Sequence, residues 1–281
     1  MRARATSVQC SPPSSPAGEG RGGGSGGTAQ ASTHLPYLPT STPIPSPQGG
    51  GEARAGTTEI ILAGVTLVAD PAGALYWPDE KILVVADLHL EKGSAFAACG
   101  VLLPPYDTPT TLARLARLVE CYAPHRVIAL GDSFHDGGGP ARMSDISRAA
   151  LTALQRGRDW VWIAGNHDPD PAENIGGRFA HALALGALTF RHEPAAKHGD
   201  GEIAGHLHPL ARVARRGRAV SRRCFASDGN RLVMPAFGAY AGGLNVRDRA
   251  IVSVFGALSF TAHMLGTGRL YAVPAARCLA D

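Results

Sequence analysis

Three short apolar segments, each followed at once by Asp, His or Asn side chains, constrain the fold of this 281-residue chain more than any other feature. Their content of Val, Ile, Leu and Trp predicts strands buried on both faces of a parallel sheet. The carboxyl ends of neighbouring parallel strands meet at one edge of a sheet, so the polar side chains that follow should lie close together. The strands are expected at residues 81–86, 126–130 and 160–164.

Two amphipathic helices are expected between these strands, because apolar residues recur there at helical spacing. Asp107 or Thr108 is the predicted N-cap of the first helix, which should end before Pro124. The second helix should cover residues 141–156 and stop at Gly157. The residues predicted to face inward are Leu112, Leu115, Leu118 and Val119 in the first helix and Ile146, Ala150, Leu151 and Leu154 in the second.

Further apolar runs surround this unit. A hairpin is expected at residues 60–68, and four later strands are expected at residues 187–190, 202–204, 232–234 and 250–255. Strands that alternate with helices early and follow one another later imply an α/β sandwich, with a parallel part first and antiparallel pairing afterwards.

Residues 1–56 differ in composition from the rest of the chain. They are rich in Gly, Pro and Ser, and such a segment buries too little apolar surface to offset the entropy lost on ordering. We therefore expect a disordered low-complexity tail that folding does not need, followed by one domain over residues 57–281. A start codon assigned too far upstream would also produce such a tail.

The composition excludes several classes of protein. Hydrophobic residues make up 44% of the chain and charged residues 18%, which is ordinary for a soluble protein with a substantial core. No apolar run reaches the roughly 18 residues of a membrane-spanning helix, and the N-terminus lacks the apolar stretch of a secretory signal. A cytoplasmic protein without membrane contact is expected.

The polar residues after the strands are suited to binding metal ions. Asp87 and His89 are two residues apart, and in an extended segment this spacing places both side chains on one side. His206 and His208 repeat the spacing further along the chain. Ligation by Asp, His and Asn without thiolates favours catalytic manganese, iron or zinc over a structural zinc site.

Each motif also has a simpler interpretation. Asp-x-His alone is more often a turn or a helix cap, Gly-Asp after a strand is commonly a turn, and a single His is more often an ordinary hydrogen-bonded or exposed residue. Gly165-Asn166-His167-Asp168 and Gly205-His206-Leu207-His208-Pro209 are more specific. The metal-site interpretation depends on all these motifs occurring together, in order, at strand ends.

A basic stretch follows the last of these motifs. Six arginines lie between residues 212 and 223, in a chain whose formal charge is only +4. The stretch could attract a polyanion such as a nucleic-acid backbone, or it could be a solvated hairpin at the edge of a sheet. The charge pattern alone leaves both interpretations open. The arginines are Arg212, Arg215, Arg216, Arg218, Arg222 and Arg223.

In this order, the motifs D-x-H, G-D, G-N-H-D, a single His and G-H-x-H resemble the calcineurin-like metallophosphoesterase superfamily, over residues 86–209. The resemblance implies a four-layer α-β-β-α sandwich of mixed sheets and a hydrolase with two divalent metal ions. Manganese is the preferred metal, with iron or zinc as alternatives. Phe134-His135-Asp136, His192-Glu193-Pro194 and residues 235–244 are further similar to a branch of that superfamily, the bacterial ligase-associated DNA damage response phosphoesterases.

The resemblance also implies roles for individual residues. His167 would touch the substrate, with Asp168 as its orienting partner. His198 is an alternative ligand to His192, which is preferred because it follows an apolar strand directly while His198 lies among loop residues. Asp132 would bridge both metal ions. The first ion would be held by Asp87, His89, Asp132 and His208, and the second by Asp132, Asn166, His192 and His206.

The expected function is hydrolysis of phosphodiester bonds by a metal-activated water, in a nuclease or phosphodiesterase associated with DNA repair. The substrate is expected to be DNA or a small cyclic or linear diester, and the branch resemblance implies a DNA ligase, a helicase and an exonuclease as partners. Two alternatives are a metal-binding module of a repair complex that lacks catalysis, and a small-molecule phosphatase. The motifs argue against a degenerate centre, because no ligand position holds a side chain unable to bind metal.

Overall fold

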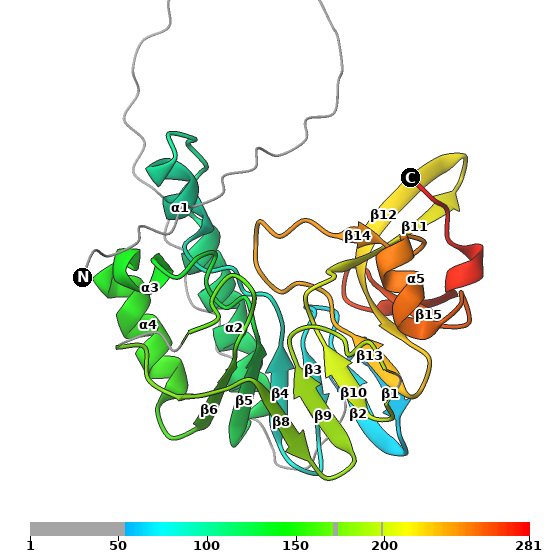
Figure 1. Ribbon diagram of the computed structural model, residues 1–281, viewed down its shortest axis with the longest axis horizontal. Helices are drawn as coiled ribbons and strands as arrows, with labels where there is room; N and C mark the ends of the chain where they lie inside the picture. The colour runs from blue at the N-terminus through cyan, green and yellow to red at the C-terminus, as the bar shows by residue number, and fades with distance from the viewer. Residues whose placement is uncertain (1–53, 171–173, 198) are drawn as a thin grey trace, which may run out of the picture. The chain divides into compact units, whose positions relative to one another are not determined.

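The computed structural model describes residues 54–170, 174–197 and 199–281, which form two β-sheets with helices on their outer sides (Figure 1). These residues belong to one compact unit, Glu52–Asp281. The predicted tail lies outside the described residues up to position 53, and so does His198. None of the described helices is long and apolar enough to cross a membrane.

The first sheet has seven strands in the order β1-β2-β3-β4-β5-β6-β7. Strands β1 to β4 pair antiparallel, whereas β4 to β7 run parallel, with Val85 opposite Ala129 and Leu130 opposite Ile163. β4 is buried along its whole length, as the sequence predicted, because both faces of the sheet are covered. The strands are β1 (Thr58–Leu62), β2 (Val65–Ala69), β3 (Leu75–Trp77), β4 (Ile82–Val85), β5 (Arg126–Leu130), β6 (Asp159–Ile163) and β7 (Arg178–Ala180).

The second sheet has nine strands, with β14-β11-β12-β13-β10-β9-β8 as its main path and β15 pairing with β12 and β16. Strands β9, β10 and β13 run parallel, and β8–β9, β11–β12 and β12–β13 pair antiparallel. The strands are β8 (Ala182–Leu185), β9 (Leu188–Arg191), β10 (Glu202–Ala204), β11 (Pro209–Arg215), β12 (Arg218–Ser227), β13 (Arg231–Val233), β14 (Leu244–Asn245), β15 (Thr261–Leu265) and β16 (Leu270–Pro274).

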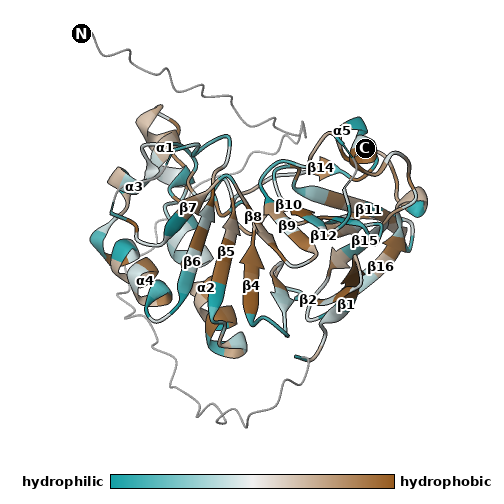
Figure 2. Cartoon of the chain, turned by 60° about the horizontal axis from the view of Figure 1, so that its bottom comes forward, coloured by the Kyte–Doolittle hydropathy of each residue, from teal (hydrophilic) through white to brown (hydrophobic). Residues whose placement is uncertain are grey.

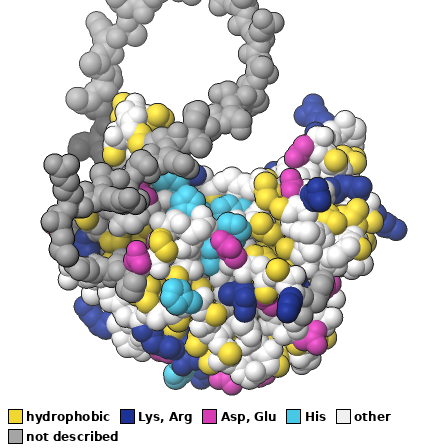
Figure 3. Space-filling model, in the orientation of Figure 1, with side chains coloured by type: hydrophobic (Ala, Val, Ile, Leu, Met, Phe, Trp, Pro, Cys, Tyr) yellow, Lys and Arg dark blue, Asp and Glu magenta, His cyan; other side chains and the backbone are white. Residues whose placement is uncertain are grey.

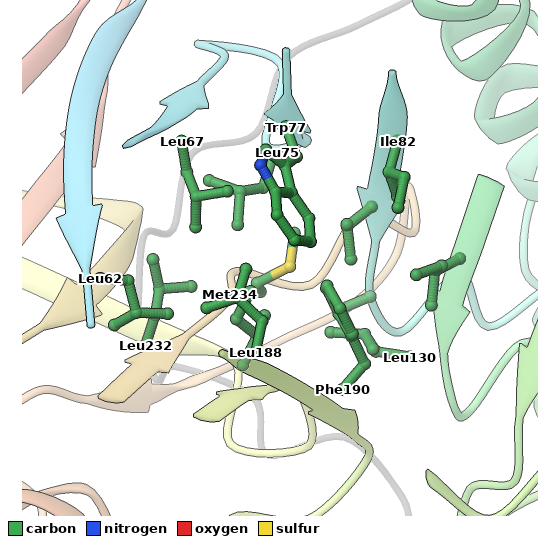
Figure 4. Close-up of a cluster of buried hydrophobic side chains, with 14 of the residues drawn as sticks. Leu62, Leu67, Leu75, Trp77, Ile82, Leu130, Leu188, Phe190, Leu232 and Met234 are labelled. Atoms are coloured by element: carbon green, nitrogen blue, oxygen red, sulfur yellow. The ribbon is translucent and has the colours of Figure 1, made fainter. Parts of the chain in front are cut away.

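The main hydrophobic core lies between the two sheets. Leu62, Leu75 and Ile82 of the first sheet meet Leu188 and Phe190 of the second, and each is at most 1% exposed (Figure 4). Burial of such a side chain contributes about 1.5–3 kcal/mol, so the interface holds the sheets face to face. Loops that leave both sheets at the same edge are thereby brought within reach of one another.

Helices cover the outer face of each sheet. α2 (Asp107–Tyr122) and α4 (Asp145–Gln155) pack on the first sheet, and α5 (Arg249–Phe255) packs on the second. Figure 2 shows the most hydrophobic strands between these outer layers. The predicted four-layer α-β-β-α sandwich is confirmed. The remaining helices are α1 (Lys92–Ala98), α3 (Gly139–Arg142) and the short 3-10 helix Ala275–Arg277.

The predicted N-cap of the first helix is wrong. The cap position of α2 is Tyr106, which makes no side-chain cap hydrogen bond. The Asp107 carboxylate instead accepts a hydrogen bond from the backbone N–H of Gly93, and the Thr108 hydroxyl accepts one from that of Glu91. Both side chains therefore fasten the segment that starts α1 rather than the start of their own helix.

The second predicted helix is divided in two. Met143 is extended, with ψ of 129°, and Ser144 starts α4 afresh as its N-cap. The Ser144 hydroxyl accepts a hydrogen bond from the Ser147 N–H at 3.2 Å. This start turns Ile146 and Ala150 to solvent, contrary to the prediction that they face inward.

Residues 250–255 form most of α5, so the predicted strand is wrong here. The Asp248 side chain caps the helix, and Gly256 ends it in the left-handed conformation with φ of 71°. A short apolar run is ambiguous between strand and helix, and capping residues at both ends decide for the helix. Its buried face consists of Ile251, Val254 and Phe255.

Candidate metal centre

Loops from the ends of five strands meet at one edge of the sandwich. The loops after β4, β5 and β6 come from the first sheet, and those after β9 and β10 come from the second. Figure 3 shows His side chains gathered near the centre of this face. The loops bring together all seven residues predicted as ligands, which are Asp87, His89, Asp132, Asn166, His192, His206 and His208.

Six of these side chains form two clusters, and in each cluster three potential ligand atoms lie within 4.8 Å of one another. In the first cluster, the Nε2 atoms of His89 and His208 are 3.4 Å apart, and His208 Nε2 is 3.3 Å from Asp87 Oδ1. In the second, His206 Nδ1 is 3.2 Å from His192 Nε2. The first cluster is Asp87, His89 and His208, and the second is Asp132, His192 and His206.

Asp132 lies between the clusters. Its Oδ1 is 3.3 Å from His192 Nε2, and its Oδ2 is 3.9 Å from His89 Nε2. The seventh predicted ligand, Asn166, joins the second cluster, because its Oδ1 is 2.9 Å from His192 Nε2. The two oxygens of one buried carboxylate therefore face different clusters.

The backbone at the centre is left-handed at five non-glycine residues. Such residues cost about 1–3 kcal/mol each and persist where the surrounding structure fixes them, often at functional sites. The predicted side-chain alternation along an extended segment is therefore wrong, and the two-residue spacing works through left-handed turns. The five residues are Asp87 (φ 53°), His89 (φ 42°), Asp132 (φ 45°), His206 (φ 67°) and His208 (φ 45°).

The protonation states suit a cation at this position. Burial lowers the pKa of His89 to about 2, which keeps that ring neutral. Burial also acts to lower the pKa of His192, but the hydrogen bond and charge of Asp132, with the charge of Asp87, raise it to about 9. Burial opposes ionisation of Asp132, yet the hydrogen bond and charge of His192 hold its pKa below the usual range. In the metal-free protein, the protonated His192 ring therefore supplies the positive charge that Asp87 and Asp132 attract.

The histidine rings are oriented as metal ligands commonly are. His192 Nδ1 is 2.9 Å from the Leu130 carbonyl oxygen, so it donates there and turns Nε2 toward Asp132. His89 Nδ1 is buried without a hydrogen-bond partner among the described residues, while its Nε2 faces His208. A mixed set of imidazole, carboxylate and amide donors fits divalent manganese, iron or zinc.

Asp168 does not contact His167, the residue expected to touch the substrate, in the way predicted. Its carboxylate accepts hydrogen bonds from the backbone N–H groups of Ser133 (2.8 Å), Phe134 (3.0 Å) and Gly165 (3.2 Å). Burial raises the pKa of Asp168 to about 6, although these backbone bonds act against the rise. Asp168 therefore ties the loop after β5 to the loop after β6.

His135 is part of the centre, although its position in the sequence did not mark it as a site residue. Its ring lies 5.8 Å from that of His89 and 5.3 Å from that of His167. Its carbonyl oxygen accepts a hydrogen bond from His167 Nδ1 at 2.7 Å, which orients the His167 ring. The available signal was its place three residues after Asp132, in a loop that leaves a buried strand.

Residues 235–244 brace the first cluster. The Phe237 N–H donates to the Ala86 carbonyl oxygen at 2.8 Å, and the Gly238 N–H donates to that of Asp87 at 3.0 Å. A Cβ atom on Gly238 would collide with the Leu88 carbonyl, so only glycine allows this approach. The segment that resembles one branch of the superfamily thus supports the turn of Asp87.

A two-sheet sandwich with Asp, His and Asn clusters at its strand ends defines a metal-dependent phosphoesterase. Residues 80–221 match the sequence profile described as calcineurin-like phosphoesterase, and the chain belongs to this family. Among solved structures, the chain is similar to a Pseudomonas putida protein, "nuclease MPE", with 27% identity and a TM-score of 0.60. That match covers 77% of this chain and 100% of the other. A search of curated proteins found no match.

Proposed function

We propose that the chain is a two-metal phosphodiesterase that cleaves DNA. The observation that carries the proposal is the position of Asp132, whose two carboxylate oxygens face separate ligand clusters. A carboxylate in this position can bridge two cations, which is the arrangement used in two-metal phosphoryl transfer. The first cation would be held by Asp87, His89, Asp132 and His208, and the second by Asp132, Asn166, His192 and His206.

Divalent metal ions, when bound, supply an acidified water as nucleophile and positive charge for the phosphate oxygens. The residues of the chain position the ligands and supply the proton for the leaving group. The loops position the ligands, and the hydrogen bond from the His167 backbone N–H to Asp132 Oδ1, 2.9 Å long, fixes the bridging carboxylate. The partly exposed His167 ring donates from Nδ1 to the His135 carbonyl, and in its protonated form it can present a second proton at Nε2 to the departing oxygen.

A phosphodiester substrate is supported by the similarity to a nuclease and by the motifs shared with the bacterial ligase-associated DNA damage response phosphoesterases. A pocket of about 420 Å³ beside His192, lined also by Asn166, His181 and Arg191, gives room for a group on one side of the scissile phosphate. By the same resemblance, we propose a cytoplasmic role in DNA repair with a ligase, a helicase and an exonuclease. Manganese is the proposed metal.

The test compares substrates and metals with one purified protein. Plasmid, single-stranded DNA, cyclic nucleotides, bis-p-nitrophenyl phosphate and phosphate monoesters are assayed side by side with manganese, iron or zinc. Hydrolysis of diesters but not monoesters is expected. Preference for monoesters would indicate a small-molecule phosphatase, and no hydrolysis with both metals bound would indicate a binding module.

A variant tests the bridging carboxylate. Asp132→Asn removes a charge shared by both cations, so metal content and rate should both fall. Asp136→Asn is the matched control, because the Asp136 carboxylate pairs with Arg142 instead of facing the clusters. Full metal occupancy in Asp132→Asn, measured by elemental analysis, would rule out the bridge.

A further inference from the structure

The basic stretch forms a long hairpin that starts directly after His208. Strands β11 and β12 pair antiparallel through a two-residue turn, Arg216-Gly217, with φ of 50° and 75°. From residue 209 to 227 the hairpin contains no Asp or Glu. Figure 1 shows the hairpin projecting beyond the sheet, and Figure 3 shows Lys and Arg side chains in the same region and His side chains nearer the centre of that face.

Two of its six arginines have structural roles. Arg223 donates hydrogen bonds to the carbonyl oxygens of Ala236 (2.9 Å) and Ala241 (2.8 Å), so it holds the segment that braces Asp87. Arg212 donates to the carbonyl oxygen of Ala280 at 3.0 Å and holds the end of the chain. Both guanidinium groups therefore already have partners within the fold.

The arginines at the tip are different. Arg215, Arg216 and Arg218 are exposed, and none of them makes a side-chain hydrogen bond or ion pair with any residue that the structure describes. Arg222 donates only to the carbonyl oxygen of its neighbour Ser221. The tip therefore presents cationic groups that the fold itself does not use.

The arginines at the tip occupy positions that are unfavourable for the stability of the hairpin itself. Arg215 lies directly opposite Arg218 in the strand register, and like charges in that position destabilise a strand pair. Arg216 occupies a left-handed turn position that Asn or Gly fills best. A polyanion bound at the tip would offset this repulsion by attracting both guanidinium groups.

We propose that Arg215, Arg216 and Arg218 bind the phosphate backbone of a DNA duplex whose scissile phosphate lies at the metal centre. The inference rests on the proposed function and adds a length requirement to it. β11 has seven residues, and at about 3.3 Å per residue its tip lies about 20 Å along the strand from His208. Duplex DNA covers that distance in about six base pairs.

The test measures duplex binding by fluorescence anisotropy in the His167→Asn background, in which cleavage is expected to be slow. Adding R215Q and R218Q should lower the slope of log Kd against log salt by about 2, because about 0.9 is lost per phosphate contact. The loss should be large with a 24-base-pair duplex and much smaller with an 8-base-pair duplex, which spans the six base pairs to the tip only when one of its ends lies at the metal centre. The matched control adds R117Q and R156Q, two exposed arginines on α2 and at the end of α4.

The same pairs of substitutions in the otherwise unchanged chain should leave hydrolysis of bis-p-nitrophenyl phosphate intact, since that diester cannot reach the tip. A salt slope unchanged by R215Q and R218Q would overturn the inference, as would equal losses on the short and long duplexes. If duplex binding depends on the tip but the unchanged chain cuts no DNA, the inference stands and DNA cleavage is wrong.

Discussion

At the scale of single residues, His167 lies beside the Asp132 carboxylate but belongs to neither of the two predicted ligand sets. Its side chain is 39% exposed, and its Nε2 lies 3.9 Å from Asp132 Oδ2. The hydrogen bond from Nδ1 to the His135 carbonyl fixes the ring and leaves Nε2 on the side of the Asp132 carboxylate. A proton-donating role and a metal-binding role for His167 predict different results for its replacement, because metal content and rate can be measured separately.

Replacing His167 by Asn should leave both metal ions bound and lower the rate. General acid assistance contributes about 10²–10⁴-fold, so a loss in that range is expected for esters with poor leaving groups. The loss should be smaller for p-nitrophenyl esters, whose leaving group needs no proton. His125→Asn, at an exposed position away from the clusters, is the control. Loss of metal from His167→Asn would place His167 among the ligands.

His192 makes metal binding depend on pH. Its pKa of about 9 means that the ring is positively charged at pH 7 in the metal-free protein. A histidine must be neutral to bind a metal ion, so the ring must release one proton first. Metal affinity should therefore rise by up to about tenfold per pH unit and level off above about pH 9. Calorimetry in buffers of different ionisation enthalpy should find about one proton released at pH 7.5. Affinity that stays constant from pH 6.5 to 8.5 would contradict this assignment.

The same raised pKa affects the metal-free fold. Because the pKa in the folded protein lies above the 6.5 of an unperturbed histidine, the protonated ring stabilises the fold fully below about pH 6.5. That contribution is lost as the pH rises through about 9. Metal should remove this loss between about pH 6.5 and 9, because the metal-bound ring stays neutral across that range.

At the scale of elements, strand ends explain how much the sequence could predict. Apolar runs fixed the positions of β4, β5 and β6, and parallel pairing carried Asp87, Asp132 and Asn166 to one edge. The sequence predicted three features wrongly: the cap of α2, the start of α4 and the helix at residues 250–255. Each depends on tertiary partners or on a single cap residue, and the spacing of apolar residues contains no information about these. His135 was missed because its role depends on ring orientation within a loop.

Gly131 lies between β5 and Asp132, and its replacement tests whether the end of this strand tolerates a side chain. Its φ is 68°, and a Cβ atom there would collide with the His192 ring. Gly131→Ala should therefore reduce metal content and rate as well as stability. Gly64→Ala is the control, since Gly64 has φ of 80° but nothing within 4 Å of a new Cβ. It should cost about 1–2 kcal/mol of stability, read from denaturant unfolding, and leave activity intact. Equal metal content in both variants would argue against the steric explanation.

At the scale of the whole molecule, the folded unit uses residues close to the predicted domain start. Arg54 Nη1 lies 3.0 Å from Asp70 Oδ2, and the buried Asp70 also accepts a hydrogen bond from the Tyr122 hydroxyl at 2.7 Å. The prediction that the fold does not need residues 1–56 can therefore be refined. Arg54 belongs with the folded part, and the boundary lies before it.

Deleting residues 1–53 should leave stability and diesterase activity unchanged. Deleting residues 1–56 should also leave activity intact, but it removes the partly exposed partner of Asp70, at a cost of at most about 1 kcal/mol. Thermal unfolding of the two truncated chains and the full chain checks this. Failure of the shorter deletion to fold would show that the tail contributes to the structure.

The ligands come from both sheets, with Asp87, His89, Asp132 and Asn166 following strands of the first and His192, His206 and His208 following strands of the second. The centre therefore exists only when the two sheets are stacked. A bound cation is linked to that stacking by mass action and adds about 4 kcal/mol when its concentration is 1,000 times Kd. Removing the cations with a chelator should therefore weaken the interface between the sheets before either sheet unfolds. During refolding, the uptake of cations would show when the two sheets pack together.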